Sequence, residues 1–406
     1  MATATQTPAP RSTRLPALDV LRGLAILGTL LTNIWLFSLP RGLGETLPGG
    51  PGDLVPRPMW SWEYVGSAAL TLVTDGKWIG LLTIMFGIGL EIQRQSALRR
   101  GERWPGTYPW RAILLIVEGA LNYLFIFEFD VLMGYGLTAL VVAAVLARSP
   151  RAQMRWLVGG LTVHVLLMAL LSVAFGWALR EIPAEELIAE GVDSSSYWAM
   201  VLDRAQNVLL GRAEIPIMVL MGIGLFLLGA ALYRAGIFLP EGAVIRRRVA
   251  LIGLGVGVPL DVLSRTVWVE WTLMFGRYVT SSIVALGVLA VVAAFYARRE
   301  RTGALGTGLS WVGRTALTCY LLQNLICSII FYDYGFGLAG HLTDATRTPV
   351  TLAVYAGVAL ALVLGASLWL RVFARGPVEI VMHRAHAALS TRSRRRRDQR
   401  LAAATS

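Results

Sequence analysis

The sequence predicts an all-α membrane protein, a polytopic bundle of about ten transmembrane helices, on two observations. Apolar stretches of about 20 residues, long enough to cross a bilayer, recur along the whole 406-residue chain. In addition, 55% of the residues are hydrophobic and only 15% are charged, a balance far from that of soluble domains. No run of polar sequence is long enough for a separate soluble domain with its own core.

The apolar stretches define the individual spans and the domain layout. The expected spans are residues 18–39, 76–93, 110–128, 131–147, 156–178, 214–235, 249–268, 277–297, 311–333 and 350–373. They form a single integral-membrane domain over residues 14–385. A disordered N-terminal tail (1–13) precedes it and a basic cytoplasmic tail (386–406) follows it.

The positions of the arginines predict the orientation. The chain has 37 basic residues, among which Lys77 is the sole lysine. The arginines concentrate in the connections between alternate spans, at 94–111, 148–155, 246–248 and 298–301. Because cytoplasmic loops carry the excess of Arg and Lys, both termini are expected in the cytoplasm and the protein in the cytoplasmic membrane.

These connections and the tail 386–406 also account for the net charge of +12. The arginines of the tail suit anionic headgroups, so membrane lipids are the expected partner and nucleic acid is not. The four histidines, at 164, 341, 383 and 386, show no ligand spacing, so no metal site is expected. A tightly bound cofactor is not expected either.

Ionisable residues inside spans carry the strongest functional signal, because each costs about 2.5–3.5 kcal/mol at the bilayer centre unless it is paired or faces water. In the first span Asp19 and Arg22 share a face. Asn33 follows Arg22 by eleven residues, which returns to nearly the same face about 16 Å higher. A polar line therefore climbs through this span.

Polar residues in the later spans extend this pattern. Glu118 and Asn122 are four residues apart on one helical face, and Glu128 and Asp130 follow at the outer end of the same span. Other polar residues in or beside spans include Lys77, Arg314, Tyr320, Gln323 and Asn324. Any one of them could merely pair within an inert bundle, but interhelical hydrogen bonds in membranes contribute only about 0.6 kcal/mol on average. So large a set favours a binding or catalytic site.

Four segments resemble the YeiB family of bacterial membrane proteins, and the resemblance extends over roughly residues 14–385. They are LDVLRGLAILGTLLTNI (18–34), FGIGLEI (86–92), GRTALTCYLLQNLICSIIFYDYGFGL (313–338) and RGPVEIVMHR (375–384). That family looks distantly related to a superfamily of membrane acyltransferases that includes heparan-alpha-glucosaminide N-acetyltransferase. The resemblance implies a bundle of transmembrane-acyltransferase type. It also implies transfer of an acyl group, often from acetyl-CoA, from the cytoplasm to an acceptor at the opposite face.

The spacing of Arg22 and Asn33 is similar to the Arg-x10-His pattern of that superfamily. The chain departs from its relatives at Asn122, where they commonly have histidine, and at Phe129-Asp130-Val131-Leu132, where they have Gly-Asp-Ile-Leu. No histidine lies between Met1 and Val163. A general base would therefore come from His164, from His341, or from a carboxylate such as Glu118 or Asp130.

The leading hypothesis is an enzyme that acylates a lipid-linked, sugar or secondary-metabolite acceptor, with an acyl-CoA as the donor. The expected catalytic residues are Asn33, Glu118, Asn122, Glu128 and Asp130; the expected substrate-binding residues are Asp19, Arg22, Lys77, Arg314, Tyr320, Gln323 and Asn324. A transporter or exporter of a small molecule is the main alternative. A membrane tailoring enzyme, cyclase-like and using paired carboxylates as proton donors, and a non-catalytic scaffold also stay open.

The predicted orientation is testable by single-cysteine labelling of intact cells. Cysteines at positions 50 and 190, in the outer connections, should react with an impermeant reagent. Cysteines at positions 100 and 395 should react only after permeabilisation, because the arginine-rich connections lie inside. Labelling at position 100 from outside would overturn the layout.

Overall fold

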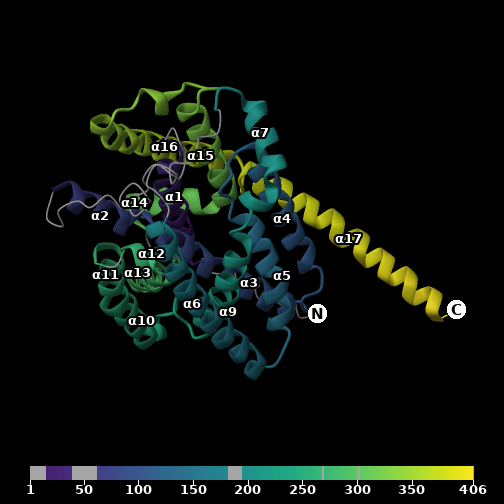
Figure 1. Ribbon diagram of the computed structural model, residues 1–406. Helices are drawn as coiled ribbons and strands as arrows, with labels where there is room; N and C mark the ends of the chain where they lie inside the picture. The colour runs from purple at the N-terminus through teal and green to yellow at the C-terminus, as the bar shows by residue number, and fades with distance from the viewer. Residues whose placement is uncertain (1–14, 39–61, 182–193, 268, 300–301, 406) are drawn as a thin grey trace.

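The computed structural model describes residues 15–38, 62–181, 194–267, 269–299 and 302–405, and within them every regular element is helical (Figure 1). The predicted N-terminal tail (1–13) and residues 39–61 and 182–193 lie outside this part of the chain. The described part confirms the all-α fold.

The first half of the chain forms α1 to α9. Their bounds are α1 Pro16–Ser38, α2 Trp62–Thr74, α3 Lys77–Arg99, α4 Tyr108–Phe125, α5 Leu132–Leu146, α6 Pro150–Glu181, α7 Tyr197–Gln206, α8 Val208–Gly211 and α9 Ile215–Arg234.

The second half is more interrupted. It contains the 3₁₀ turn η3 Pro240–Gly242, α10 Ala243–Ala250, the π-helical η4 Leu251–Gly257, α11 Val258–Thr266, α12 Val269–Phe275, the π-helical η5 Gly276–Thr280, α13 Ser281–Tyr296, α14 Gly303–Arg314, α15 Ala316–Phe331, η6 Leu338–His341, α16 Asp344–Val372 and α17 Pro377–Thr405.

Seven continuous helical segments in the described part are long and apolar enough to cross a membrane, or eight if the bent pair α14–α15 counts as one span. This is fewer than the ten spans expected from sequence. The difference lies in α4 and α5. The apolar α5 has only 15 residues, and the 18-residue α4 includes Arg111 and Glu118.

Helices α1, α3 and α9 occupy the centre of the bundle. Over its most apolar 18 residues α1 is 78% buried, whereas the corresponding stretch of α6 is only 17% buried. The exposed side chains of α6 include Leu166, Leu170 and Trp177, and an apolar outer face of this kind suits contact with lipid. The bundle therefore presents apolar side chains to its surroundings along α6.

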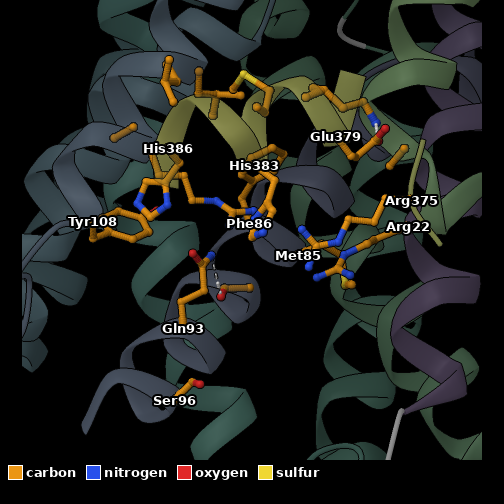
Figure 2. A pocket seen from close by; sticks show the side chains of 18 of the residues that line it. Arg22, Met85, Phe86, Gln93, Ser96, Tyr108, Arg375, Glu379, His383 and His386 are labelled. Atoms are coloured by element: carbon orange, nitrogen blue, oxygen red, sulfur yellow. Dashed lines mark hydrogen bonds between the residues drawn. The ribbon is translucent and has the colours of Figure 1, made fainter. Parts of the chain in front are cut away.

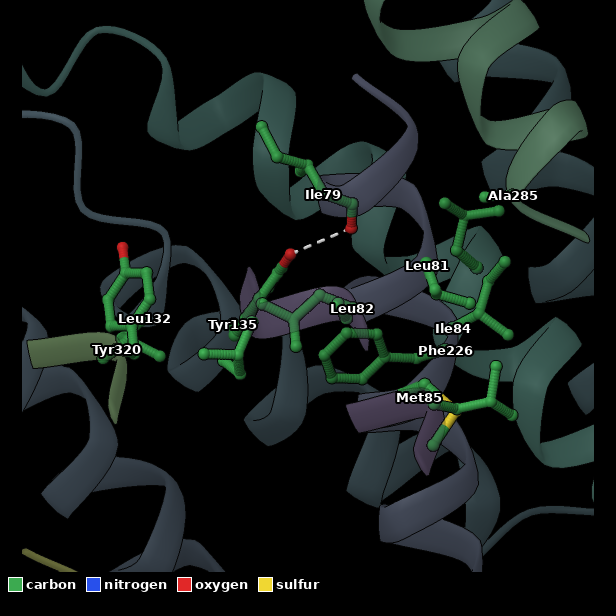
Figure 3. Packing of buried hydrophobic residues seen from close by; sticks show 14 of the residues in the cluster. Ile79, Leu81, Leu82, Ile84, Met85, Leu132, Tyr135, Phe226, Ala285 and Tyr320 are labelled. Atoms are coloured by element: carbon green, nitrogen blue, oxygen red, sulfur yellow. Dashed lines mark hydrogen bonds between the residues drawn. The ribbon is translucent and has the colours of Figure 1, made fainter. Parts of the chain in front are cut away.

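Close packing at the centre depends on small residues, as is usual between membrane helices. Gly87 on α3 lies against the backbone of Phe226 on α9, so closely that no Cβ could fit between them. Tyr135 on α5 is fully buried beside Phe226, and its hydroxyl donates to the carbonyl of Ile79 at 3.2 Å (Figure 3). It also exchanges a hydrogen bond with Thr83 at 2.9 Å.

The predicted span 311–333 is broken. Helices α14 and α15 meet at Thr315 with a bend of 88°. A broken helix leaves backbone N–H groups without partners at the start of its second half. Here the Glu379 carboxylate of α17 accepts hydrogen bonds from the amides of Leu317 (2.8 Å) and Thr318 (3.3 Å), and from the Thr318 hydroxyl (2.6 Å). This cap comes from 61 residues further along the chain, so a hydropathy pattern could not reveal it.

A buried ion-pair network joins α3, α11 and η5. The ammonium of Lys77 lies 2.6 Å from Asp261, and Arg265 bridges Asp261 (3.1 Å) and Asp75 (2.7 Å). Arg277 pairs with Asp75 as well. Each carboxylate thus meets two cations, which compensates the cost of burying charge in this region.

We predict that Lys77 stabilises the fold. Lys77→Met leaves the fully buried Asp261 with one cation fewer, and breaking a buried pair costs about 3–5 kcal/mol. Thermal unfolding of the purified protein in detergent should therefore shift to clearly lower temperature. Lys77→Arg, which keeps the charge, serves as the control, and its unfolding temperature should fall much less. An unchanged midpoint for Lys77→Met would contradict this role.

Candidate functional site

A large cavity opens at the end of the bundle where α3 ends and α4 and α17 begin; we call this the basic end. The cavity has a volume of about 1380 Å³. Its walls come from α1, α3, α4, α14, α15 and α17, together with the connection 100–107 and the first residue of α5. Positive-inside topology predicts that this end faces the cytoplasm.

The mouth of the cavity is strongly basic. Six arginines line the cavity, Arg22, Arg100, Arg103, Arg111, Arg314 and Arg375, against the carboxylates of Asp19, Glu102 and Glu379. Glu102 already pairs with Arg100 at 2.9 Å, and Asp19 lies 3.8 Å from Arg22. The remaining surplus of positive charge favours an anionic ligand.

The polarity of the cavity changes along α3. Arg100 and Gln93 line its outer part, Gly89 lies at the middle, and Phe86 and Leu82 line its inner part. Eighteen residues of helix separate Arg100 from Leu82, a rise of about 27 Å. A Cβ on Gly89 would meet only the Arg22 guanidinium, at 3.6 Å, so Gly89 keeps the passage wide at the level of Arg22. The site therefore suits a long ligand with an anionic head and a less polar arm.

Helix α17 supplies one wall of the mouth. Arg375, His383 and His386 line the cavity from this helix and its start (Figure 2). His386 contacts the carbonyl of Thr107 at 3.3 Å and so ties α17 to the connection before α4. Partial desolvation and the positive charges of Arg375 and Arg111 lower the pKa of His383 from its ordinary value, which favours the neutral imidazole.

A cluster of buried polar side chains lies beyond the inner end of the cavity. Asn122 donates to one carboxylate oxygen of Asp130 at 2.9 Å, and the amide of Met133 donates to the other at 2.9 Å. Both carboxylate oxygens of Glu118 are buried without a hydrogen-bond partner among the described residues. Leu132 and Tyr320 line the cavity on this side. Because Glu118 lies one turn from Asn122, the predicted grouping on α4 is present.

Tyr320 is linked to this cluster through the backbone beside Asp130. Its hydroxyl accepts a hydrogen bond from the amide of Val131, next to Asp130, at 3.5 Å. The approach of α4 to Asp130 depends on Gly119, since a Cβ there would lie 2.5 Å from the Asp130 carboxylate. Tyr320, a wall residue of the cavity, thus lies next to the chain segment that carries Asp130.

Two amide contacts join α1 to α15 at a deeper level than the cavity. Gln323 donates to the Thr29 hydroxyl at 3.2 Å, and Asn33 donates to Asn324 at 3.2 Å. The side-chain oxygen of Gln323 and the side-chain nitrogen of Asn324 are buried without partners among the described residues. Unsatisfied buried amides of this kind are sites for water or for a polar ligand.

Glu128 lies apart from the other carboxylates, toward the opposite end of the bundle. It pairs with Arg204 of α7 at 2.8 Å and accepts from the Tyr332 hydroxyl at 3.4 Å. Arg212 donates to the carbonyl of Asp130 at 3.1 Å from the same side. Helix α7 thus covers this end.

The twelve residues singled out in the sequence are divided among five places. Asp19, Arg22, Arg314 and Tyr320 line the cavity; Glu118, Asn122 and Asp130 form the cluster behind it; Asn33, Gln323 and Asn324 form the amide contacts; Glu128 and Lys77 lie in separate ion pairs. Lys77 does not line the cavity.

Sequence reasoning missed the contribution of the C-terminal helix. Arg375, Glu379, His383 and His386 line the cavity, although none of them was among the expected site residues. The signal for three of them was present, because the segment RGPVEIVMHR was one of the four that carried the family resemblance. Arg100, Arg103 and Arg111 were used only to predict orientation.

The fold defines a class: a polytopic α-helical membrane protein with a basic cavity at one end. Residues 232–388 match the family described as protein of unknown function DUF418. The chain is 29% identical over 401 residues to the uncharacterized protein YeiB of Escherichia coli K12, a match covering 93% of this chain and 98% of that protein. It is 28% identical over 392 residues to the uncharacterized protein YxaH of Bacillus subtilis 168, covering 90% and 92%. These matches confirm the resemblance to the YeiB family.

Proposed function

We propose that the protein is an acyltransferase of the bacterial cytoplasmic membrane. An acyl-CoA enters the cavity from the cytoplasmic, basic end, and its acyl group passes to a lipid-linked, sugar or other small-molecule acceptor. The observation that carries this proposal is the continuity of two features: an arginine-rich cavity, and a buried carboxylate cluster directly beyond its inner end.

The dimensions of the cavity support a donor of this kind. Phosphate groups bind arginine through charge-assisted hydrogen bonds, and six arginines line the cavity. Phe86 and Leu82, deeper along α3, suit the less polar arm and the acyl group. In the proposed complex Arg22 and Arg314 bind the anionic part of the donor, and Tyr320 lies near the thioester.

The chemistry needs one base. The acceptor oxygen or nitrogen attacks the thioester carbonyl carbon, its proton passes to the carboxylate of Glu118 or Asp130, and the C–S bond breaks as the new C–O or C–N bond forms. The CoA thiolate leaves and takes up a proton. The partly unsatisfied amides of Gln323 and Asn324, together with Asn33, would hold polar groups of the acceptor.

Asn122 and Glu128 have different parts in this proposal. Asn122 donates to Asp130 and therefore orients this carboxylate. In relatives of the protein, a histidine at this position would pair with the same carboxylate. Glu128 stays in its ion pair with Arg204 and shapes the end from which the acceptor arrives. Both groups act by position rather than by taking a proton.

Donor binding is measurable without knowing the acceptor. Coenzyme A should bind the purified protein in nanodiscs, and Arg22→Ala and Arg314→Ala should each weaken that binding about tenfold, since a hydrogen bond to a charged group contributes about 1.5–3 kcal/mol. Arg151→Ala, an exposed arginine outside the cavity, is the matched control. Unchanged affinity in both cavity variants, or no affinity in the parent, would count against an acyl-CoA donor.

The base is tested in a deletion strain complemented with variants, by mass spectrometry of its metabolites and surface glycolipids. The parent should restore a product heavier by one acyl group. Glu118→Gln or Asp130→Asn should abolish it, because a positioned base contributes about 10² to 10⁴ in rate. Asn122→His should retain or raise activity if the ancestral reaction persists. Parent-like activity in all three variants would place the chemistry elsewhere.

Export of an anionic small molecule is the second candidate. One observation favours it: the cavity opens at the basic end, while the Arg204–Glu128 pair and α7 cover the opposite end. A pathway closed at one end is what alternating access requires. The same deletion strain distinguishes the two, because loss of an exporter leaves an unmodified product inside the cells.

A further inference from the structure

Helix α17 has two parts with different surroundings. Its first turns belong to the cavity wall, through Glu379 and His383, and Glu379 caps α15. Its distal part runs clear of the rest of the bundle to the C-terminus (Figure 1). The sequence between them, residues 378–405, holds neither glycine nor proline, so the helix is continuous from Pro377 to Thr405.

The distal part is polybasic. Residues 392–400 contain Arg392, the run 394–397 and Arg400, against a single acid, Asp398. Helix α16, a candidate membrane span, ends at Val372, and this basic segment begins 20 residues later. Basic clusters next to a cytoplasmic span end bind anionic lipid headgroups, at about 1 kcal/mol for each arginine near the surface. An anionic membrane surface therefore matches this segment in charge and in location.

We propose that the distal part of α17 docks on the anionic surface of the membrane, and that docking holds its first turns in the cavity wall. The second half of this proposal rests on the proposed binding of a CoA-type donor. Anionic lipid thereby sets the affinity of the cavity for its anionic ligand.

The unbroken length of α17 supports a coupling between docking of its distal part and ligand binding in the cavity. From Glu379 to Arg400 the helix rises about 31 Å without a break, so an orientation imposed at the distal end is transmitted to the wall. At the wall α17 is fixed by hydrogen bonds at Glu379 and by the contact of His386 with Thr107. A ligand that needs the complete wall binds more tightly as the docked fraction rises.

The test uses the full-length protein in nanodiscs of phosphatidylcholine, with or without phosphatidylglycerol. A fluorophore on Gln399→Cys, an exposed position, reports docking; the two native cysteines, Cys319 and Cys327, are buried. Coenzyme A is the binding probe. The test variant replaces the four arginines at 394–397 with glutamine, which keeps helix propensity and leaves the cavity residues intact.

A matched variant replaces four exposed arginines of the same end, Arg151, Arg155, Arg247 and Arg248, with glutamine. It controls for the general repulsion of coenzyme A by an anionic surface. With phosphatidylglycerol the label should move to a less polar environment in the parent and in this control, but not in the 394–397 variant. The parent should also bind coenzyme A at least about fivefold more tightly than the 394–397 variant in anionic discs, and equally in neutral discs.

Two results would overturn the proposal separately. If the fluorescence of the label in the parent is the same with and without phosphatidylglycerol, docking is ruled out. A label that responds, combined with equal coenzyme A affinities of the parent and the 394–397 variant in anionic discs, rules out the coupling. If coenzyme A binds in neither lipid, the proposed donor fails and the coupling with it, while the label still decides whether α17 docks.

Discussion

The interaction between Glu379 and the start of α15 is the constraint on which the cavity depends. A helix broken by 88° inside an apolar bundle needs an acceptor for its exposed amides, because unsatisfied backbone groups are costly where water is scarce. Glu379 supplies that acceptor from α17. The same contact places Arg314 before the break and Tyr320 after it on the cavity wall, and it brings His383 to the mouth. The Glu379 carboxylate thus both caps α15 and lines the cavity.

Charge is distributed over the bundle in two different ways. In the network of Asp75, Lys77, Asp261, Arg265 and Arg277 every carboxylate meets two cations, so the network is internally compensated and acts as a structural joint. At the cavity mouth arginines outnumber carboxylates. A compensated network needs no ligand, whereas a basic cavity attracts anions. This difference in charge balance distinguishes structural ion pairs from candidate ligand-binding residues, although the residue types are alike in the sequence.

The sequence predicted the parts of the site that depend on local periodicity. Asp19 and Arg22 share a helical face and both line the cavity; Glu118 and Asn122 share another, and Asn122 contacts Asp130 as part of one cluster. Periodicity within one helix cannot pair Lys77 with Asp261, 184 positions away in the chain, nor bring His386 to Thr107. Such contacts depend on tertiary packing, and the bend at Thr315 depends on a cap from another helix.

Asn122 and its neighbours give the two carboxylates of the buried cluster different surroundings. An asparagine amide donates a hydrogen bond but does not accept a proton near neutral pH, and here it donates to Asp130. The amide of Met133, at the start of α5, donates to the other oxygen, and a helix N-terminus favours negative charge. Asp130 is therefore held in one orientation by two donors, while Glu118 beside it has no donor within the described part of the chain. Two carboxylates in such different surroundings are suited to different proton-transfer roles.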